Sequence, residues 1–166
     1  LSGQTLDLRE TLRFNFSRSL VDQPFSEKRF VLDATLAWDT ANDRPGITID
    51  ANEKFRVVYV DNTTVEMYGF IFTGGVAESN VNGQQSNGGG IYNHYGWLTI
   101  GDSVIAGNRA SKAGGGIYNS GGEYETQGQH DGWLYLVNTS IVGNVVTEEN
   151  AIGGGLYNES GGVATL

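Results

Sequence analysis

A six-residue motif, Gly-Gly-Gly-[Ile/Leu]-Tyr-Asn, occurs three times in this chain of 166 residues. The copies occupy residues 88–93, 114–119 and 153–158, so successive copies begin 26 and 39 residues apart. Self-similarity at a period of about 20 to 50 residues is typical of proteins built from stacked units, none of which can bury its apolar face alone. The motif therefore predicts a repeat architecture.

The sequence between the copies aligns as well and divides each unit into short segments. Residues 97–100 match residues 133–136, and residues 103–108 match residues 139–144. The 13 additional residues of the second spacing fall within 120–130 and 145–152. The aligned segments are rich in β-branched and aromatic side chains, alternate in polarity and are bounded by Gly, Asn and Asp. Each unit is therefore predicted to contain three strands.

Such a unit buries its apolar face when copies stack at roughly 4.8 Å, so that each strand pairs with its equivalents on both sides. The predicted fold class is all-β: a right-handed parallel β-helix, a solenoid with about 26 residues per coil and about six coils. The Leu-x-x-Leu-x-Leu signature of leucine-rich repeats is absent, and a propeller blade needs about 40 residues. The side chains expected inside are those of Leu98, Ile100, Ile105, Leu134, Leu136 and Ile141.

The chain is predicted to form one domain, 1–166, with irregular coils in 1–80 and regular repeats in 81–166. Residues 25–38 favour a strand and a loop over a helix. The third repeat stops before its last expected strand, which would leave open strand edges, so the chain is expected to be a fragment of a longer one. Strands before residue 80 are expected within 6–8, 12–16, 29–32, 47–50, 55–60 and 65–72.

Stacking places equivalent residues about 5 Å apart, and like charges at that distance are destabilising. The alignment avoids this problem, because Asp102 matches Asn138 and Arg109 matches Val145. The triple glycines are expected to turn the chain and let backbones approach closely. Amide ladders are expected at corners, where Asn tolerates a left-handed backbone. The asparagines concerned are Asn93, Asn119 and Asn158 in one set and Asn108 and Asn144 in another.

The charge distribution excludes several functions. The net charge is −9, and after Arg56 ten acidic residues are accompanied by only Arg109 and Lys112. A nucleic-acid groove needs many Lys and Arg residues, so nucleic acid is not an expected partner. No apolar run reaches 18 residues, so this segment is not expected to insert into a membrane. The absence of Cys excludes a disulfide scaffold and a Cys-based zinc site.

Alternation along the repeats places aromatic rings on the outer surface. If Ile91 and Ile117 face inward, the tyrosine after each faces outward, and the tryptophans before Leu98 and Leu134 do the same. A column of exposed rings could stack on sugars or on a protein partner. Alternatively, the rings cover the outer sheet or lie beneath the insertion at 120–130. The predicted ligand-binding residues are Tyr92, Tyr118, Tyr157, Trp97 and Trp133.

Catalytic and metal-binding residues are not predicted. Glycoside hydrolysis needs two carboxylates at a fixed separation, and a β-helix lyase needs a Ca²⁺ cage with a basic residue; the sequence presents neither pattern. His94 and His130 each precede an aligned tryptophan by three residues, but they lack an aligned carboxylate or thiolate. No cofactor is expected, because the acidic side chains of the loops are expected to be solvated. Binding of Ca²⁺ to these loops is the alternative. The loops carry Glu148, Glu149 and Asn150, Glu123 and Glu125, and Asp39 and Asp43.

The repeats resemble those of a known class of proteins. Residues 88–91 and 114–117, each followed by Ile-x-Gly-Asn at 105–108 and 141–144, resemble the paired GGA[I/L] and FxxN repeats of chlamydial polymorphic outer-membrane proteins. They are still more similar to bacterial right-handed parallel β-helix repeat surface proteins. The resemblance covers residues 29–166. Isoleucine replaces the FxxN phenylalanine, so the chlamydial likeness is one of architecture.

The resemblance implies a structural or adhesive module of an extracellular or cell-surface bacterial protein, and not an enzyme. The implied partners are other segments of the same long chain, other proteins or glycans. A carbohydrate-binding β-helix that uses the Tyr and Trp side chains is the alternative function. A polysaccharide lyase or hydrolase is the second alternative.

Overall fold

Short strands joined by turns make up most of the protein. The computed structural model describes residues 4–15, 29–78, 86–121 and 131–166. Within these ranges there is no α-helix, and the one helical element is a 3₁₀ turn at Thr35–Ala37. The fold is therefore all-β, as predicted.

The strands form four parallel sheets, named A to D here. Sheet A orders β1 (Gln4–Asp7), β4 (Ile47–Asp50), β7 (Phe70–Thr73), β11 (Val104–Ala106) and β15 (Ser140–Val142). Sheet B orders β2 (Leu12–Asn15), β5 (Val58–Asp61), β9 (Ile91–His94), β13 (Ile117–Ser120) and β17 (Leu156–Asn158). Sheet C orders β3 (Arg29–Asp33), β6 (Thr64–Tyr68), β10 (Trp97–Gly101), β14 (Gly132–Val137) and β18 (Gly162–Thr165). Sheet D orders β8 (Val76–Ala77), β12 (Arg109–Ala110) and β16 (Val145–Val146).

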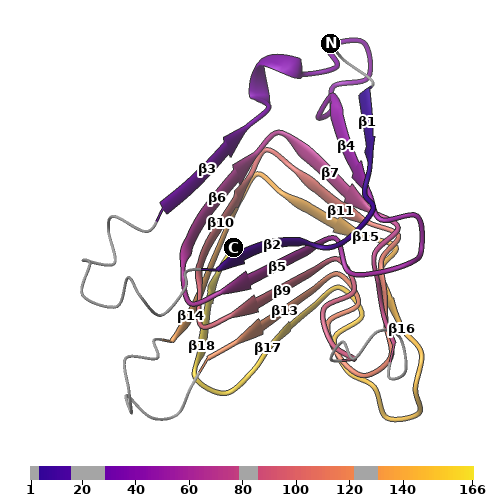
Figure 1. Ribbon diagram of the computed structural model, residues 1–166, viewed down its shortest axis with the longest axis vertical. Coiled ribbons are helices and arrows are strands. Elements are labelled where there is room, and N and C mark those ends of the chain that lie inside the picture. The colour runs from indigo at the N-terminus through magenta and orange to yellow at the C-terminus, as the bar shows by residue number, and fades with distance from the viewer. Residues whose placement is uncertain (1–3, 16–28, 79–85, 122–130) are drawn as a thin grey trace.

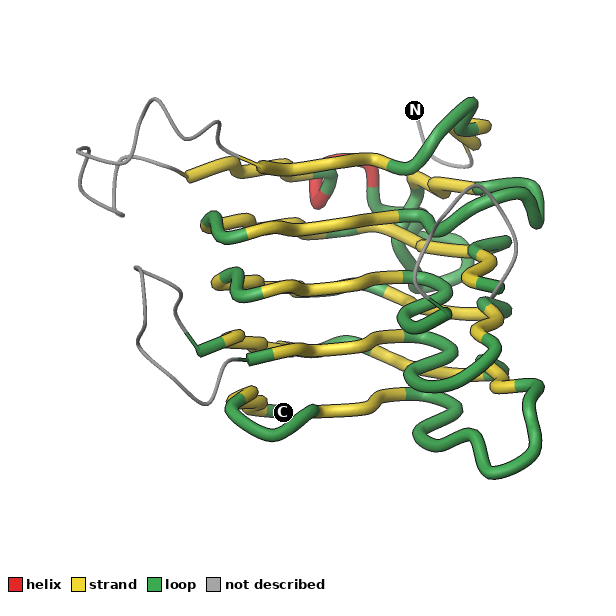
Figure 2. The backbone as a smooth tube through the Cα atoms, turned by 60° about the horizontal axis from the view of Figure 1, so that its bottom comes forward, coloured by secondary structure: helices red, strands yellow, loops and turns green. Residues whose placement is uncertain are grey.

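Consecutive strands of the chain belong to different sheets in a recurring order. The chain passes through sheets A, B and C, and from β8 onward sheet D is added between A and B. In Figure 1 sheets A, B and C border a triangle, and Figure 2 shows the strands at successive levels of a stack. In the part of the chain that the structure describes, each large sheet has five strands, against about six coils expected. The arrangement is compatible with the predicted parallel β-helix.

The strand register follows the sequence alignment. Ile117 pairs with Ile91 on one side and Leu156 on the other, although 26 and 39 residues separate these positions. Likewise Trp97 pairs with Trp133. Sheet D was not predicted, because strands of two residues are too short to show a periodicity. The prediction of three strands per unit was therefore one too few for the units that include sheet D.

Each region expected to form a strand before residue 80 contains one, although the strand expected at 55–60 begins only at Val58. The run at 65–72 divides into β6 and β7 at Gly69, whose φ of 79° is one that L side chains rarely adopt. Residues 29–38 form a strand followed by the 3₁₀ turn, as the sequence favoured.

The space between sheets A, B and C holds one apolar core. Of the side chains predicted inside, Leu98, Ile100, Ile105 and Leu134 are fully buried and Leu136 nearly so. Ile141 packs against the core but is only half-buried. It lies in β15, which among the described strands pairs with β11 alone.

Amide ladders join successive levels, as predicted. Asn93 Nδ2 donates to Asn119 Oδ1 at 2.7 Å, and Asn119 Nδ2 donates to Asn158 Oδ1 at 2.7 Å. Asn108 Nδ2 donates to Asn144 Oδ1 at 2.9 Å. The expected left-handed backbone is wrong for these residues, since none of the five has a positive φ. Their position in or beside extended strands is what aims the amides along the stack.

The triple glycines serve two different needs. The first of each set turns the chain, with φ of 65° at Gly88, 61° at Gly114 and 66° at Gly153. In the first two sets the second glycine lets backbones approach closely: a Cβ on Gly115 would lie 2.2 Å from the carbonyl oxygen of Val145. Both roles agree with the prediction.

Candidate functional site

The five predicted ligand-binding residues lie on two different faces. The three tyrosines form a column on the outer side of sheet B, in register with Tyr59. The two tryptophans pair with each other on the outer side of sheet C. The two groups therefore form separate candidate sites.

The tyrosine column is largely covered, as in the alternative expectation that these rings cover the outer sheet, and not exposed. Tyr92 is 4% and Tyr118 5% exposed, whereas Tyr157 is half-buried. The rings pack on one another, with centroids 4.9 Å apart for Tyr92 and Tyr118 and 5.4 Å apart for Tyr118 and Tyr157. They form an apolar cluster with Ala113 that is separate from the main core. Alternation correctly placed the rings outside the core, but segments between the strands bury them.

A cleft of about 370 Å³ lies beside this column. Tyr118 and Tyr157 form part of its wall, and the segment 148–152 forms much of the rest. Lys112, Glu148 and Glu149 add charges of both signs to the lining. The cleft is therefore a mixed surface of phenol rings and charged side chains.

Arg56 packs against the column and was not predicted as a site residue. It is 2% exposed, and its guanidinium donates to the carbonyl oxygens of Asn87 at 2.6 Å and Gly88 at 2.7 Å. Its Cζ lies 5.1 Å from the ring centroid of Tyr92 and 5.7 Å from that of Tyr59, in cation–π geometry. Burial lowers the pKa of Arg56 to about 10. Val58 pairs with Ile91, so Arg56 occupies a position that is glycine in the motif. To identify Arg56 from the sequence, residues 55–57 would have had to be aligned with the three glycines.

The burial of this column predicts how stability changes at alkaline pH. Burial raises the pKa of Tyr92 to about 12, and it also raises the pKa of Tyr59 and of Tyr118. A tyrosine pKa that is higher in the folded state gives stability that is complete below about pH 10 and is lost as the pH rises through the folded value. The lowered pKa of Arg56 has the opposite effect on the free energy of unfolding, but it is one group, whereas three tyrosines have a raised pKa.

We therefore expect the free energy of unfolding to fall between about pH 10 and pH 12. In the folded protein, phenolate absorbance at about 295 nm should include a late phase from Tyr59, Tyr92 and Tyr118, whose pKa values are raised by burial. Tyr92→Phe should remove part of this late phase. A single phase near pH 10 in the folded state would contradict this account of the column.

The outer face of sheet C is the exposed aromatic surface. Trp97 is 45% and Tyr135 39% exposed, while Trp133 between them is half-buried. The ring centroids of Trp97 and Trp133 are 5.6 Å apart, and those of Trp133 and Tyr135 are 6.3 Å apart with planes inclined by 11°. These three residues are called the aromatic face below. Tyr135 was not predicted, although its position two residues after Trp133 on the same strand was a usable signal.

Polar and aliphatic groups extend the aromatic face across sheet C. Arg29 and Glu66 form a two-point ion pair, with both N–O distances 2.8 Å, and Tyr68 donates its hydroxyl to Glu66 at 3.1 Å. Val31 and Val137 are both more than half exposed. The surface therefore offers rings and aliphatic groups for packing, with a carboxylate and a guanidinium nearby.

His94 does not pair with a second histidine in the described residues. Its register neighbours are Asp61 and Ser120, and Nδ1 lies 3.0 Å from Asp61 Oδ1. Ser120 Oγ donates to Glu159 at 2.7 Å. His130 lies outside the described residues. Among those described, no three His, Asp or Glu side chains are grouped as a metal site would require.

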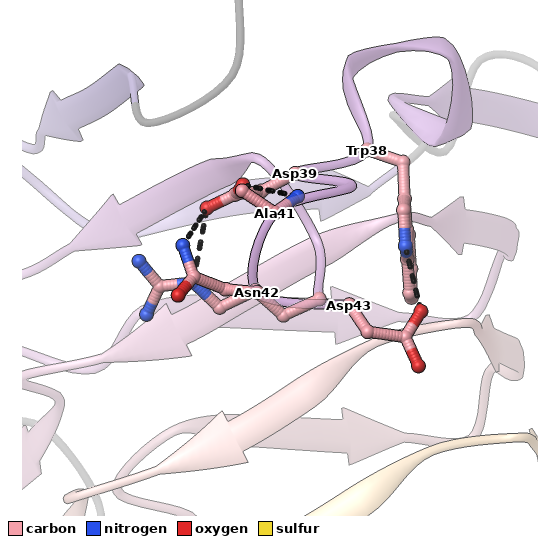
Figure 3. Close-up of polar contacts among 6 residues, drawn as sticks. Trp38, Asp39, Ala41, Asn42 and Asp43 are labelled. Carbon is pink, nitrogen blue, oxygen red and sulfur yellow. Dashed lines mark hydrogen bonds and ion pairs between the residues drawn. The ribbon is translucent and has the colours of Figure 1, made fainter.

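The acidic loops differ in what their carboxylates do. Asp39 accepts hydrogen bonds from Asn42 at 2.8 Å, from Arg44 at 3.4 Å and from the backbone of Ala41. Asp43 accepts from the indole of Trp38 at 3.3 Å. Figure 3 shows the two carboxylates on opposite sides of this turn. Glu148 and Glu149 line the tyrosine cleft, and residues 123 and 125 lie outside the described ranges.

Comparisons with known proteins find no match to the chain among family models, curated proteins or solved structures. In the parts of the chain that the structure describes, no helix has the length and apolar character needed to cross a membrane.

Proposed function

We propose that this chain is a stretch of right-handed parallel β-helix and serves as a structural or adhesive module of an extracellular or cell-surface bacterial protein. The recurring order of sheets A, B, C and D supports the helical winding. Crossovers between parallel strands are right-handed in about 98% of cases, which supports the hand. The repeats resemble those of bacterial β-helix surface proteins, which supports the location.

A structural role fits the way the stack is held together. Apolar side chains recur in register at the core positions, and asparagines recur in the levels that carry the glycine motif, so apolar columns and amide ladders run from one level to the next. Parallel pairing satisfies the backbone groups of the internal strands on both sides. The result is a rigid support for whatever its outer faces carry.

The aromatic face is the observation that most directly supports the adhesive role. Large apolar groups are often buried, so two exposed rings beside a half-buried one on the outer side of sheet C support a surface that contacts something else. Tryptophan and tyrosine are also the residues that contribute most at binding surfaces, because each offers a large rigid contact area with a polar group at one end. The aromatic face is where we place adhesion.

A carbohydrate-binding function is the second candidate. Sugar rings stack on indole and phenol faces, and Thr99 and Glu66 lie on the same side of sheet C as hydrogen-bonding partners for hydroxyl groups. Because Tyr92 and Tyr118 are covered, we place the sugar-binding residues of this candidate at Trp97, Trp133 and Tyr135 instead of at the five aromatic residues predicted from the sequence.

The test is retention of the labelled protein on a glycan array and on immobilised bacterial surface proteins. We expect the Trp97→Ala, Trp133→Ala double variant to lose at least tenfold in retention, since large interface aromatics each contribute about 2 kcal/mol. Val142→Ala, an exposed substitution on sheet A, is the matched control and should bind as the unmodified protein does.

The class of surface that retains the protein decides between the two candidates. Retention on glycans favours carbohydrate binding, and retention on proteins favours protein adhesion. Equal retention of the double variant and the protein would contradict an adhesive aromatic face. Release of reducing sugars from bound glycans would instead establish the lyase or hydrolase alternative.

A further inference from the structure

Two arginines of the chain pack on the first half of the tyrosine column of sheet B. In register order, the members of this column are Tyr59, Tyr92, Tyr118 and Tyr157. The Cζ of Arg13 lies 5.1 Å from the ring centroid of Tyr59, and the Cζ of Arg56 lies 5.1 Å from that of Tyr92. Aromatic rings attract cations through the negative charge of their faces. The first half of the column therefore already holds guanidinium groups.

The second half of the column differs in this respect. In the described part of the chain, the cation–π contacts involve the first two rings and neither Tyr118 nor Tyr157. By strand register, the positions equivalent to Arg56 in the next two levels are Gly89 and Gly115. Glycine has no side chain that could reach the rings. Two neighbouring halves of one column are therefore alike in their rings but not in the cations that cover them.

The cleft of about 370 Å³ lies against this second half, with Tyr118 and Tyr157 in its lining. Its volume is within the range of small-molecule sites, about 300–1,000 Å³. Three other lining residues, Asn87, Ala113 and Ile152, form parallel bridges with one another at successive levels of the stack. The cleft therefore runs along the side of the stack and across three levels.

The lining of the cleft favours a positively charged ligand with many hydrogen-bond donors. Glu148 and Glu149 contribute two carboxylates, against the single ammonium of Lys112. The surrounding field has the same sign, because residues 57–166 carry ten acidic residues and two basic ones. Asn87 adds a side-chain oxygen that has no hydrogen-bond partner among the described residues. Carboxylates and amide oxygens all accept hydrogen bonds from a cationic N–H group.

A guanidinium suits this surface better than an ammonium does. It is planar, stacks on aromatic rings, carries five N–H donors and is more weakly hydrated. Arg56 shows how such a group binds next to the cleft. Its guanidinium donates to the carbonyl oxygens of Asn87 at 2.6 Å and Gly88 at 2.7 Å while it lies over the ring of Tyr92. Because Asn87 also lines the cleft, the position of Arg56 and the cleft adjoin one another.

We propose that the cleft formed by Tyr118, Tyr157 and residues 148–152 binds a guanidinium group, such as an arginine side chain of a peptide. The plane of the group packs on the phenol rings, and its N–H groups donate to the carboxylates of the two glutamates. The ammonium of Lys112 opposes binding. This site goes beyond the proposed adhesion and does not use the aromatic face, so either proposal can fail without the other.

Isothermal titration calorimetry of the protein with Nα-acetyl-arginine amide in low salt tests the proposal. We expect saturable binding of one molecule per chain, which weakens as salt is added because the cleft is open to solvent. The citrulline analogue is the matched ligand control, since it has the same shape but no charge. It should bind at least about tenfold more weakly. The lysine analogue should also bind more weakly than the arginine compound.

Substitutions in the cleft should change the affinity in opposite directions. The Glu148→Gln, Glu149→Gln double variant should bind the arginine compound at least about fivefold more weakly, whereas Lys112→Gln should bind it about threefold more tightly. The Asp7→Asn, Asp131→Asn double variant removes the same charge at exposed positions outside the lining and should change the affinity less than about twofold. Circular dichroism checks that every variant keeps its β structure.

The Trp97→Ala, Trp133→Ala double variant separates this site from the aromatic face, and it should bind the arginine compound as the unmodified protein does. No saturable binding of the arginine compound, or equal binding of its citrulline or lysine analogue, would overturn the proposal. Equal losses in the two acidic double variants would also overturn it, because they would show a general effect of net charge and not a site in the cleft.

Discussion

Replacing Gly115 with alanine is expected to lower the free energy of unfolding by at least about 3 kcal/mol. The new Cβ would lie 2.2 Å from Val145 O and 2.5 Å from Gly154 O. Both contacts are with backbone atoms, which cannot rotate away as a flexible side chain would. The neighbouring level would have to move, and the parallel pairing of β13 with β17 would be disturbed. Urea unfolding followed by tryptophan fluorescence measures the loss.

The third repeat provides a matched control for this substitution. Gly154 occupies the equivalent position, but a Cβ there would meet only Asn144 O, at 3.3 Å. Gly154→Ala should therefore cost less than about 1 kcal/mol. Similar losses for the two variants would show that glycine acts at this position through chain flexibility and not through close backbone approach.

Replacing Asn119 with leucine is expected to cost about 4 kcal/mol. The fully buried Asn119 amide accepts a bond from Asn93 and donates to Asn158 and to Gly132 O. Leucine has a similar size but can make none of these bonds. Gly132 O would lose its Asn119 donor, and Asn93 Nδ2 would keep only Gly96 O and Trp133 O as acceptors. A buried polar group left unsatisfied costs about 1–3 kcal/mol. Thermal and urea unfolding give the measured value.

Asn158→Leu is the corresponding control at the end of the ladder. Asn158 is exposed, so water can replace the lost hydrogen bonds, and we expect a cost below about 1.5 kcal/mol. If Asn119→Leu proved neutral, the ladder would be dispensable for stability, and the repeated asparagines would need a different explanation.

The parts of the fold that could be predicted are those that the repeat specifies directly. Identical residues in successive units must stack, so aligning the motif copies was enough to pair Ile117 with Ile91 and Leu156. The same alignment gave the amide ladders. Alternation within a strand then determined which side chains, such as Leu98 and Ile105, fill the core.

The parts that could not be predicted depend on segments between the strands. Alternation places Tyr92 and Tyr118 outside the core, but it does not reveal that neighbouring segments cover them. Sheet D joins strands of two residues, which are too short to show a period. Arg56 lies in a level that lacks the glycine motif, so the repeat carried no information about its contacts. These features arise from tertiary packing.

The candidate site illustrates the same limit. The sequence grouped five aromatic residues because they share an outward direction, yet the structure divides them between sheets B and C. Outward direction is a property of one strand, whereas exposure depends on everything that packs over it. Tyr135 follows the alternation rule and could have been included, since it lies on the same side of β14 as Trp133.

In-register parallel stacking is the central claim, and engineered disulfides test it most directly because the chain has no cysteine of its own. Cysteines at Thr99 and Tyr135 in sheet C, or at Ala106 and Val142 in sheet A, would occupy paired positions. Neighbouring strands lie about 4.8 Å apart, which a disulfide can span. We expect both pairs to oxidise within the chain, whereas Thr99→Cys with Val137→Cys, two residues out of register, should remain reduced. Efficient bridging of the shifted pair, or none in the matched pairs, would contradict the stack.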